Sequence, residues 1–107
     1  MTTFDDRERA EEAKFARDEE MQFRIHARRN RLLGQWAAEK MGLSAAEADA
    51  YAKAVVQADF EESSDEDVIR KLLGDLTAAG IDSDEGEIRA ALEAKQIEAR
   101  RALIGEV

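Results

Sequence analysis

Residues 5–20 constrain the fold of this chain most strongly, because 12 of their 16 side chains are charged and the two signs are interleaved. The large apolar side chains near this segment are Phe15 within it and Phe4 just before it. Its alanine, glutamate, arginine and lysine residues nevertheless favour a helix. A segment that can be helical but cannot bury itself is either a solvated extension or a ligand that folds on its partner.

The rest of the chain favours an all-α fold. Its 107 residues are enough for one compact domain with a modest core, and no proline interrupts the helical patterns. The sequence also lacks cysteine, which excludes disulfides and thiolate zinc sites. Because the chain starts without an apolar signal region and has no apolar run of membrane-spanning length, we expect a cytoplasmic protein.

Four apolar patterns with a helical period predict a four-helix bundle. The first helix is predicted to be long, with an N-terminal part that projects from the bundle or is disordered. We therefore expect a flexible or marginally helical segment over residues 1–20 and a bundle domain over residues 21–107. The helices of that domain are predicted at about 21–41, 45–61, 65–79 and 84–104.

Local signals mark where these helices begin. Ser44 followed by Glu47 is a capping box, in which each side chain satisfies a free backbone N–H. Either serine of residues 63–64 can form a similar box with the acid three positions later. The fourth helix is predicted to begin near Asp82 or Ser83. Glycines after the first and third patterns suit helix C-termini.

The predicted core consists of one apolar stripe from each helix. Trp36 lies on the first stripe, and we interpret it as a core anchor rather than a ligand-binding residue. Small alanines on the second helix would let a neighbouring helix approach closely. The predicted core residues are Ile25, Leu32, Leu33, Trp36, Ala37, Ala48, Ala52, Val56, Phe60, Val68, Ile69, Leu72, Leu73, Leu76, Ala79, Ile88, Ala91, Leu92, Ala99, Ala102 and Leu103.

A local basic stretch interrupts a chain of formal charge −9. The overall acidity argues against nucleic-acid binding, since that binding depends on neutralising phosphates. Within the stretch, Arg28, Arg29 and Arg31 could contact a nucleotide phosphate or another anionic partner. Alternatively, they pair with the acidic residues of 59–67 inside the fold, where each exposed pair contributes about 0–1 kcal/mol.

The sequence does not indicate an enzyme or a cofactor site. His26 is the one histidine, so a histidine triad or a histidine-based metal cluster cannot form within one chain. Residues 82–93 faintly resemble a calcium loop, but Glu87 occupies the position that requires glycine. A capped helix start explains that segment better, and no metal site is expected.

Several longer motifs resemble one known family over essentially the whole chain. That family is the zeta subunit of the alphaproteobacterial F-type ATP synthase. The motifs are Phe4-Asp5-Asp6-Arg7-Glu8, Glu12-Ala13-Lys14-Phe15-Ala16, Arg28-Arg29-Asn30-Arg31-Leu32-Leu33-Gly34, Trp36-Ala37-Ala38 and Asp59-Phe60-Glu61-Glu62.

The resemblance implies a four-helix bundle with an inhibitory N-terminus. Such an inhibitor enters the catalytic head between the alpha and beta subunits, close to the gamma subunit, and blocks hydrolytic rotation. The protein would then lie in the cytoplasm, peripheral to the inner membrane through the ATP synthase. The partner-binding residues carried over from the family are Phe4, Asp5, Arg7, Glu8, Glu12, Lys14, Phe15 and Arg17.

Two other functions remain open from the residues themselves. The chain could be a nucleotide-sensing bundle, with the three arginines of residues 28–31 on the phosphates. It could also be a generic helical adaptor for another protein. No heptad pattern is sustained for long enough to predict a coiled-coil dimer, so we expect a monomer.

Overall fold

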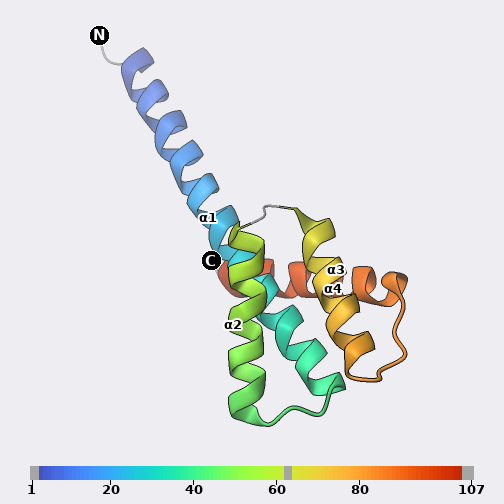
Figure 1. Ribbon diagram of the computed structural model, residues 1–107. Coiled ribbons are helices and arrows are strands. Elements are labelled where there is room, and N and C mark those ends of the chain that lie inside the picture. The colour runs from blue at the N-terminus through green and yellow to red at the C-terminus, as the bar shows by residue number, and fades with distance from the viewer. Residues whose placement is uncertain (1–2, 62–63, 105–107) are drawn as a thin grey trace.

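The chain folds into a four-helix bundle, as predicted (Figure 1). This computed structural model describes the backbone of residues 3–61 and 64–104 and the side chains of residues 19–59 and 64–104. No strand occurs within those backbone ranges. The helices are α1 Thr3–Lys40, α2 Ala45–Glu61, α3 Asp65–Ala78 and α4 Glu85–Leu103.

The N-terminal part of α1 projects well beyond the other three helices (Figure 1). At 1.5 Å per residue, a helix of 38 residues measures about 57 Å, which accounts for the elongated extents of 66 × 24 × 21 Å. The C-terminal half of α1 packs mainly against α2 and α4. The bundle is therefore built around one end of a long rod.

The core lies where the predicted stripes meet. Leu33 and Ala37 of α1 are fully buried in one cluster with residues of α2, α3 and α4, among them Val55, Leu72 and Ile88. Trp36 packs against this cluster while remaining partly exposed, in keeping with its predicted role as a core anchor. The buried apolar side chains are Ile25, Leu33, Ala37, Ala38, Ala52, Val55, Val68, Ile69, Leu72, Leu76, Ile88, Leu92 and Ala99.

Ala79 is a correction to the predicted core. It is exposed and caps α3, which ends at Ala78. Gly80 follows with φ +79°, and Gly42 after α1 has φ +71°. Both glycines adopt the left-handed conformation that ends a helix, which other residues adopt only with strain.

Helices α1 and α2 approach closely at Gly34 and Ala52. A Cβ atom added to Gly34 would lie 2.7 Å from the backbone Cα of Ala52 and 3.2 Å from Val55 Cγ2. Any side chain at Gly34 would therefore force the helices apart. The predicted role of small residues on α2 is confirmed at this contact.

The helix starts match the predicted capping chemistry in part. The Ser44 and Glu47 box is confirmed: Ser44 N donates to Glu47 Oε1 at 2.9 Å, and Glu47 N donates to Ser44 Oγ at 3.2 Å. At α3, however, the Ser64 hydroxyl accepts from Glu66 N at 3.2 Å rather than from Asp67 N. The predicted box of Ser64 with Asp67 is therefore wrong, because the hydroxyl turns toward the nearer amide. The alternative box of Ser63 with Glu66 lies outside the described residues.

The predicted helix range of about 84–104 agrees with α4, although the start expected near Asp82 or Ser83 is one to two residues early. Asp84 is its N-cap, with an extended backbone and Oδ1 accepting from Glu87 N at 2.8 Å. Asp82 and Ser83 precede the helix. Aspartate is a strong N-cap residue, and here it satisfies the amide three positions later. A capped helix start thus occupies the segment that resembled a calcium loop.

Candidate functional site

A hollow lies between α1 and α2 close to the point where α1 leaves the bundle. Phe23 stands beside it with 59% of its surface exposed, the largest exposure among the described large apolar residues. The hollow has a volume of about 560 Å³ and is open to solvent. Its lining includes Phe23, Arg24, Arg28, Arg31, Lys53 and Val56.

A second hollow of about 350 Å³ adjoins the other side of Phe23. Its polar groups come from Gln22, His26, Asn30 and Asp59, while Val56 contributes to both hollows. Phe23 is therefore an aromatic ridge between a basic hollow and a more neutral one.

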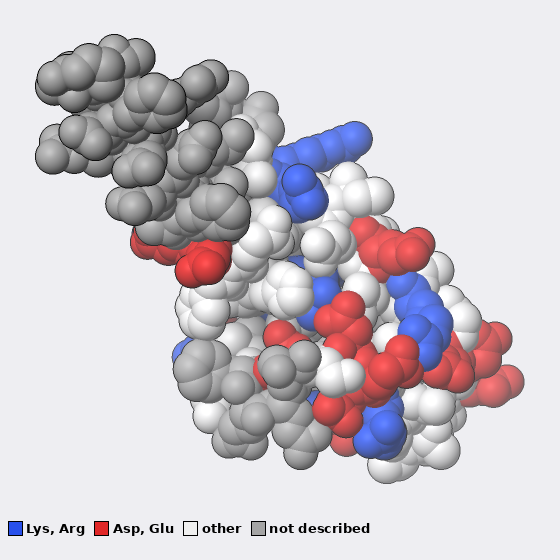
Figure 2. Space-filling view, turned by 90° about the horizontal axis from the view of Figure 1, so that it is seen from above, with Lys and Arg blue, Asp and Glu red and all other residues white. Residues whose placement is uncertain are grey.

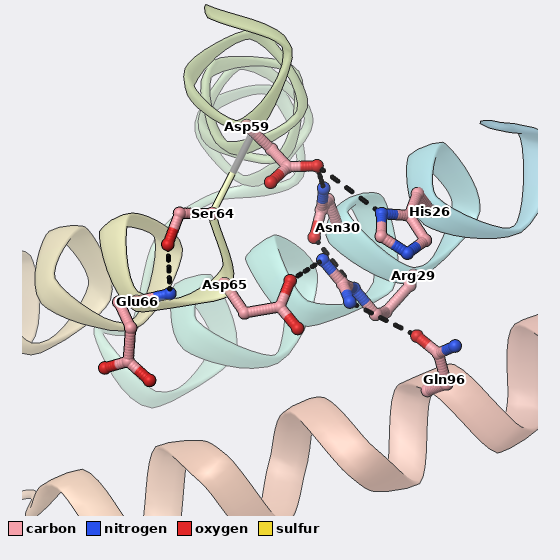
Figure 3. A network of polar contacts seen from close by, with 8 residues as sticks. All are labelled: His26, Arg29, Asn30, Asp59, Ser64, Asp65, Glu66 and Gln96. Atoms are coloured by element: carbon pink, nitrogen blue, oxygen red, sulfur yellow. Dashed lines mark hydrogen bonds and ion pairs between the residues drawn. The ribbon is translucent and has the colours of Figure 1, made fainter. Parts of the chain in front are cut away.

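Beneath this surface, a polar network centres on Arg29, which is 1% exposed (Figure 3). Its Nη2 atom donates to Asp65 Oδ1 at 2.9 Å, and Nη1 donates to Gln96 Oε1 at 3.2 Å. Its Nε atom donates to Asn30 Oδ1 at 3.1 Å. A buried guanidinium is tolerated only when it is paired and hydrogen-bonded, and this one is both. The network thus ties α1 to α3 and α4.

Asn30 extends the network to the end of α2 (Figure 3). This residue is also 1% exposed, and its Nδ2 atom donates to Asp59 Oδ2 at 2.7 Å. His26 Nδ1 lies 3.9 Å from the same oxygen. These contacts fasten α1 to all three other helices within a few turns.

The three predicted anion-binding arginines are placed differently. Arg29 points inward to Asp65, within the acidic range 59–67 that was the alternative prediction. Arg31 is exposed and pairs with Asp49 at 3.3 Å, outside that range. Arg28 is exposed and lines the basic hollow together with Arg31. The structure therefore brings Arg28 and Arg31 to one surface and commits Arg29 to the interior.

The side chains predicted to bind a partner are not among those that the structure describes. Their backbone belongs to the projecting part of α1. Their role stays a prediction at this point. The residues concerned are Phe4, Asp5, Arg7, Glu8, Glu12, Lys14, Phe15 and Arg17.

Acidic side chains dominate another face of the bundle, with a few basic ones between them (Figure 2). Arg89 bridges α3 and α4, donating to Glu66 Oε2 at 2.6 Å and to Glu85 Oε1 at 2.7 Å. The bond from Arg89 lowers the pKa of Glu66 below its usual range. Ion pairs between exposed side chains therefore link α3 to α4, and similar pairs occur beside the basic hollow.

Two kinds of site are missing from the described part of the chain. No group of three or more histidine, cysteine or acidic side chains there could hold a metal ion. Nor does any described helix combine the length and apolar character needed to cross a bilayer.

Sequence reasoning missed Phe23 and Lys53 as surface residues of interest. The available signal was that Phe23 lies off the apolar stripe of its helix while neighbouring a run of arginines. A large aromatic outside the stripe of an amphipathic helix cannot enter the same core. Lys53 gave no signal by itself, because only the packing of α2 on α1 brings it to the hollow.

Comparison with known proteins shows similarity to one family and to solved structures. The model of the family described as ATPase inhibitor subunit zeta matches residues 1–102. A protein with a solution NMR structure is 49% identical to this chain, with a TM-score of 0.70. That similarity covers 81% of this chain and 99% of the other. No curated protein matches the chain significantly.

Proposed function

The chain belongs to the ATPase inhibitor subunit zeta family, and we propose that it inhibits the F-type ATP synthase by inserting the projecting part of α1 into the catalytic head. The observation that carries this proposal is the family match, which begins at residue 1 and so includes the whole projecting part. An inhibitor of this kind needs no catalytic group. The partners would be the alpha, beta and gamma subunits, with insertion at an alpha/beta catalytic interface near gamma.

The proposed mechanism is steric. The catalytic interfaces must open and close as gamma turns, and a helix wedged into one of them would prevent that movement. Phe4 and Phe15 would be the anchors, because buried aromatic side chains supply much of the energy at protein interfaces. The surrounding charges would fix the register of the helix. Those charges belong to Asp5, Arg7, Glu8, Glu12, Lys14 and Arg17.

The bundle would act as a stop behind the inserted helix. Its cross-section of 24 × 21 Å is about twice the diameter of a single helix. A wedge is effective only if its base resists being pushed aside. The buried network around Arg29 provides that resistance, since it joins α1 to α3 and α4 just behind the projecting part.

Deleting residues 1–19 tests the proposal. ATP hydrolysis by a purified F-type catalytic head would be measured with the full chain and with the shortened chain. We expect the full chain to inhibit and the shortened chain not to inhibit. Far-ultraviolet circular dichroism and a thermal melt would show whether the shortened bundle is folded. Full inhibition by a folded, shortened chain would refute the assigned segment.

Nucleotide sensing is a second candidate, favoured by the position of Arg28 and Arg31 on the same hollow. Titration with ATP or ADP, followed by NMR, would test it. Shifts confined to residues near these two arginines would support binding there. We also propose a monomer in the cytoplasm, peripheral to the inner membrane through the ATP synthase, which size-exclusion chromatography and membrane fractionation would test.

A further inference from the structure

The basic hollow between α1 and α2 has a charge opposite to that of the whole protein. Arg24, Arg28, Arg31 and Lys53 line it, although the chain carries a formal charge of −9. A local cationic surface on an acidic protein attracts an anionic partner while the remaining surface repels it. The charge pattern therefore favours an acidic occupant in one orientation.

The carboxylates that already neighbour these cations hold them weakly. Arg24 pairs with Glu20 at 2.8 Å, and Asp49 is shared by Arg31 and Lys53 at 3.3 and 3.1 Å. Exposed pairs of this kind are easily exchanged for a partner carboxylate. Arg28 has no hydrogen bond or ion pair with the side chains or backbone that the structure describes. Arg28 is exposed and lines the hollow, so a carboxylate of a partner can reach it.

Apolar side chains also line this hollow. The exposed ring of Phe23 on α1 and the half-buried Val56 on α2 face it, and Leu103 from the end of α4 closes one side. Aromatic and arginine side chains around an apolar pocket are the residues most enriched at energetic centres of interfaces. A volume of about 560 Å³ accommodates several side chains of a docked segment. A phosphate alone would leave this apolar surface uncovered.

Residues within 23–31 of α1 line the hollow. They directly follow the part of α1 that projects from the bundle in Figure 1, so any protein that grips the projecting part comes close to the hollow. On the premise of the proposed function, we propose that this α1–α2 groove binds an acidic amphipathic segment of the catalytic head. Carboxylates of that segment would meet Arg28 and Lys53. An apolar side chain from it would pack on Phe23 and Val56. The groove would thereby fix the bundle against the head.

Charge reversal at Arg28 tests this second contact with the full chain. Binding of Arg28→Glu to the purified head would be measured by biolayer interferometry beside Arg70→Glu, an equal charge change on the exposed face of α3. We expect about tenfold weaker binding for Arg28→Glu and less than about twofold change for Arg70→Glu. Higher salt should weaken the binding of the original chain to the head more than it weakens the binding of Arg28→Glu. Equal binding by both variants would overturn the proposal.

A photo-crosslink identifies the occupant directly. Benzoylphenylalanine would replace Phe23 in the full chain, and the crosslinked peptide of the head would be sequenced by mass spectrometry. An acidic segment supports the proposal, and a basic segment or no crosslink overturns it. Competition by ADP or ATP for the original chain, with NMR shifts at residues 24–31, would instead assign the groove to nucleotide.

These experiments separate the two proposals. If the full chain fails to inhibit the head at all, the proposed function fails. If the full chain inhibits and the chain without residues 1–19 does not, but Arg28→Glu binds and inhibits normally, only the groove proposal fails. Circular dichroism of each variant confirms that it is folded, since both substituted arginines are exposed.

Discussion

Arg29 and Asp65 form an ion pair of 2.9 Å whose two members have very different environments. The arginine side chain is 1% exposed, whereas the aspartate side chain is 49% exposed. Removing the aspartate would strand a charge in the interior. Removing the arginine would leave a carboxylate that water can reach. The cost of breaking the pair therefore depends on which partner is replaced.

We predict that Asp65→Ala destabilises the bundle more than Arg29→Met. The first should cost about 3–5 kcal/mol in the free energy of unfolding, because it leaves the guanidinium buried without its counter-ion. The second should cost about 1–2 kcal/mol, because methionine fills much of the space and the main unsatisfied group is Asn30 Oδ1. Urea denaturation followed by circular dichroism would measure both.

Asp67→Ala is the control for this comparison. Asp67 lies in the same first turn of α3 and pairs with the exposed Arg70. Its replacement removes a similar interaction with the helix dipole but strands no buried charge, so it should cost no more than about 1 kcal/mol. If Asp65→Ala costs no more than this control, the buried guanidinium does not depend on its pair.

The helical fold was predictable because each helix carries an apolar stripe. On α3, Val68, Ile69, Leu72 and Leu76 were all expected in the core and are all buried. The burial of Arg29 was not foreseen, because an arginine in a basic run is usually on the surface. Its position was nevertheless informative, since it lies four residues after Ile25 and four before Leu33, on the same face.

The site was less predictable than the fold. The α1–α2 groove depends on residues from two helices, and the sequence gives no register between Arg28 and Lys53. Phe4 and Phe15 were singled out from the sequence, and their side chains lie outside the described ones. Their role depends on a partner surface, which no property of this chain by itself specifies.

Gly34→Ala should destabilise the bundle, and Gly74→Ala should stabilise it. Alanine favours a helix over glycine by about 1 kcal/mol at either position. At Gly34 the new methyl group would meet the backbone of Ala52 at 2.7 Å, and overpacking of this kind costs about 1–3 kcal/mol. Gly74 is helical and has no atom within 4 Å of the added methyl. Thermal melts would measure the melting temperature of each variant. If both melting temperatures shifted in the same direction, the result would contradict the close approach of α1 and α2.

The original chain should be more stable than Tyr51→Phe at neutral pH. We expect this difference in the free energy of unfolding to become smaller at high pH. Burial raises the pKa of Tyr51 well above its usual 10.0, aided by the hydrogen bond of its hydroxyl to Asp75 Oδ2 at 2.7 Å. The unfolded chain loses this proton above pH 10.0 while the folded chain keeps it. The contribution of the protonated Tyr51 to the free energy of unfolding is therefore fully present below that pH and declines above it.

At neutral pH, Tyr51→Phe should cost about 0.5–1.5 kcal/mol, since Lys71 still donates to Asp75. Urea denaturation at neutral pH and above pH 10.0 would measure the difference between the two proteins. Other alkaline titrations affect both proteins and cancel in that difference. A difference in the free energy of unfolding that grows with rising pH would contradict the raised pKa of Tyr51.

Glu19→Pro tests whether α1 must be continuous for inhibition. Proline removes one helical hydrogen bond and clashes with the preceding turn, so it would kink α1 between the projecting part and the bundle. Glu19 is exposed and precedes Ile25, the first buried side chain in the described part of the chain. The free energy of unfolding of the bundle should therefore change by no more than about 0.5 kcal/mol. Inhibition of ATP hydrolysis should weaken about tenfold, because a kinked rod no longer holds the bundle as a stop behind the wedge.

Glu19→Ala is the matched control, since it removes the same charge while preserving the helix. It should inhibit like the original chain. If Glu19→Pro also inhibited fully, the connection between bundle and wedge could be flexible. The stop would then have to come from a separate contact of the bundle, and the groove around Phe23 and Arg28 would be the place to look for it.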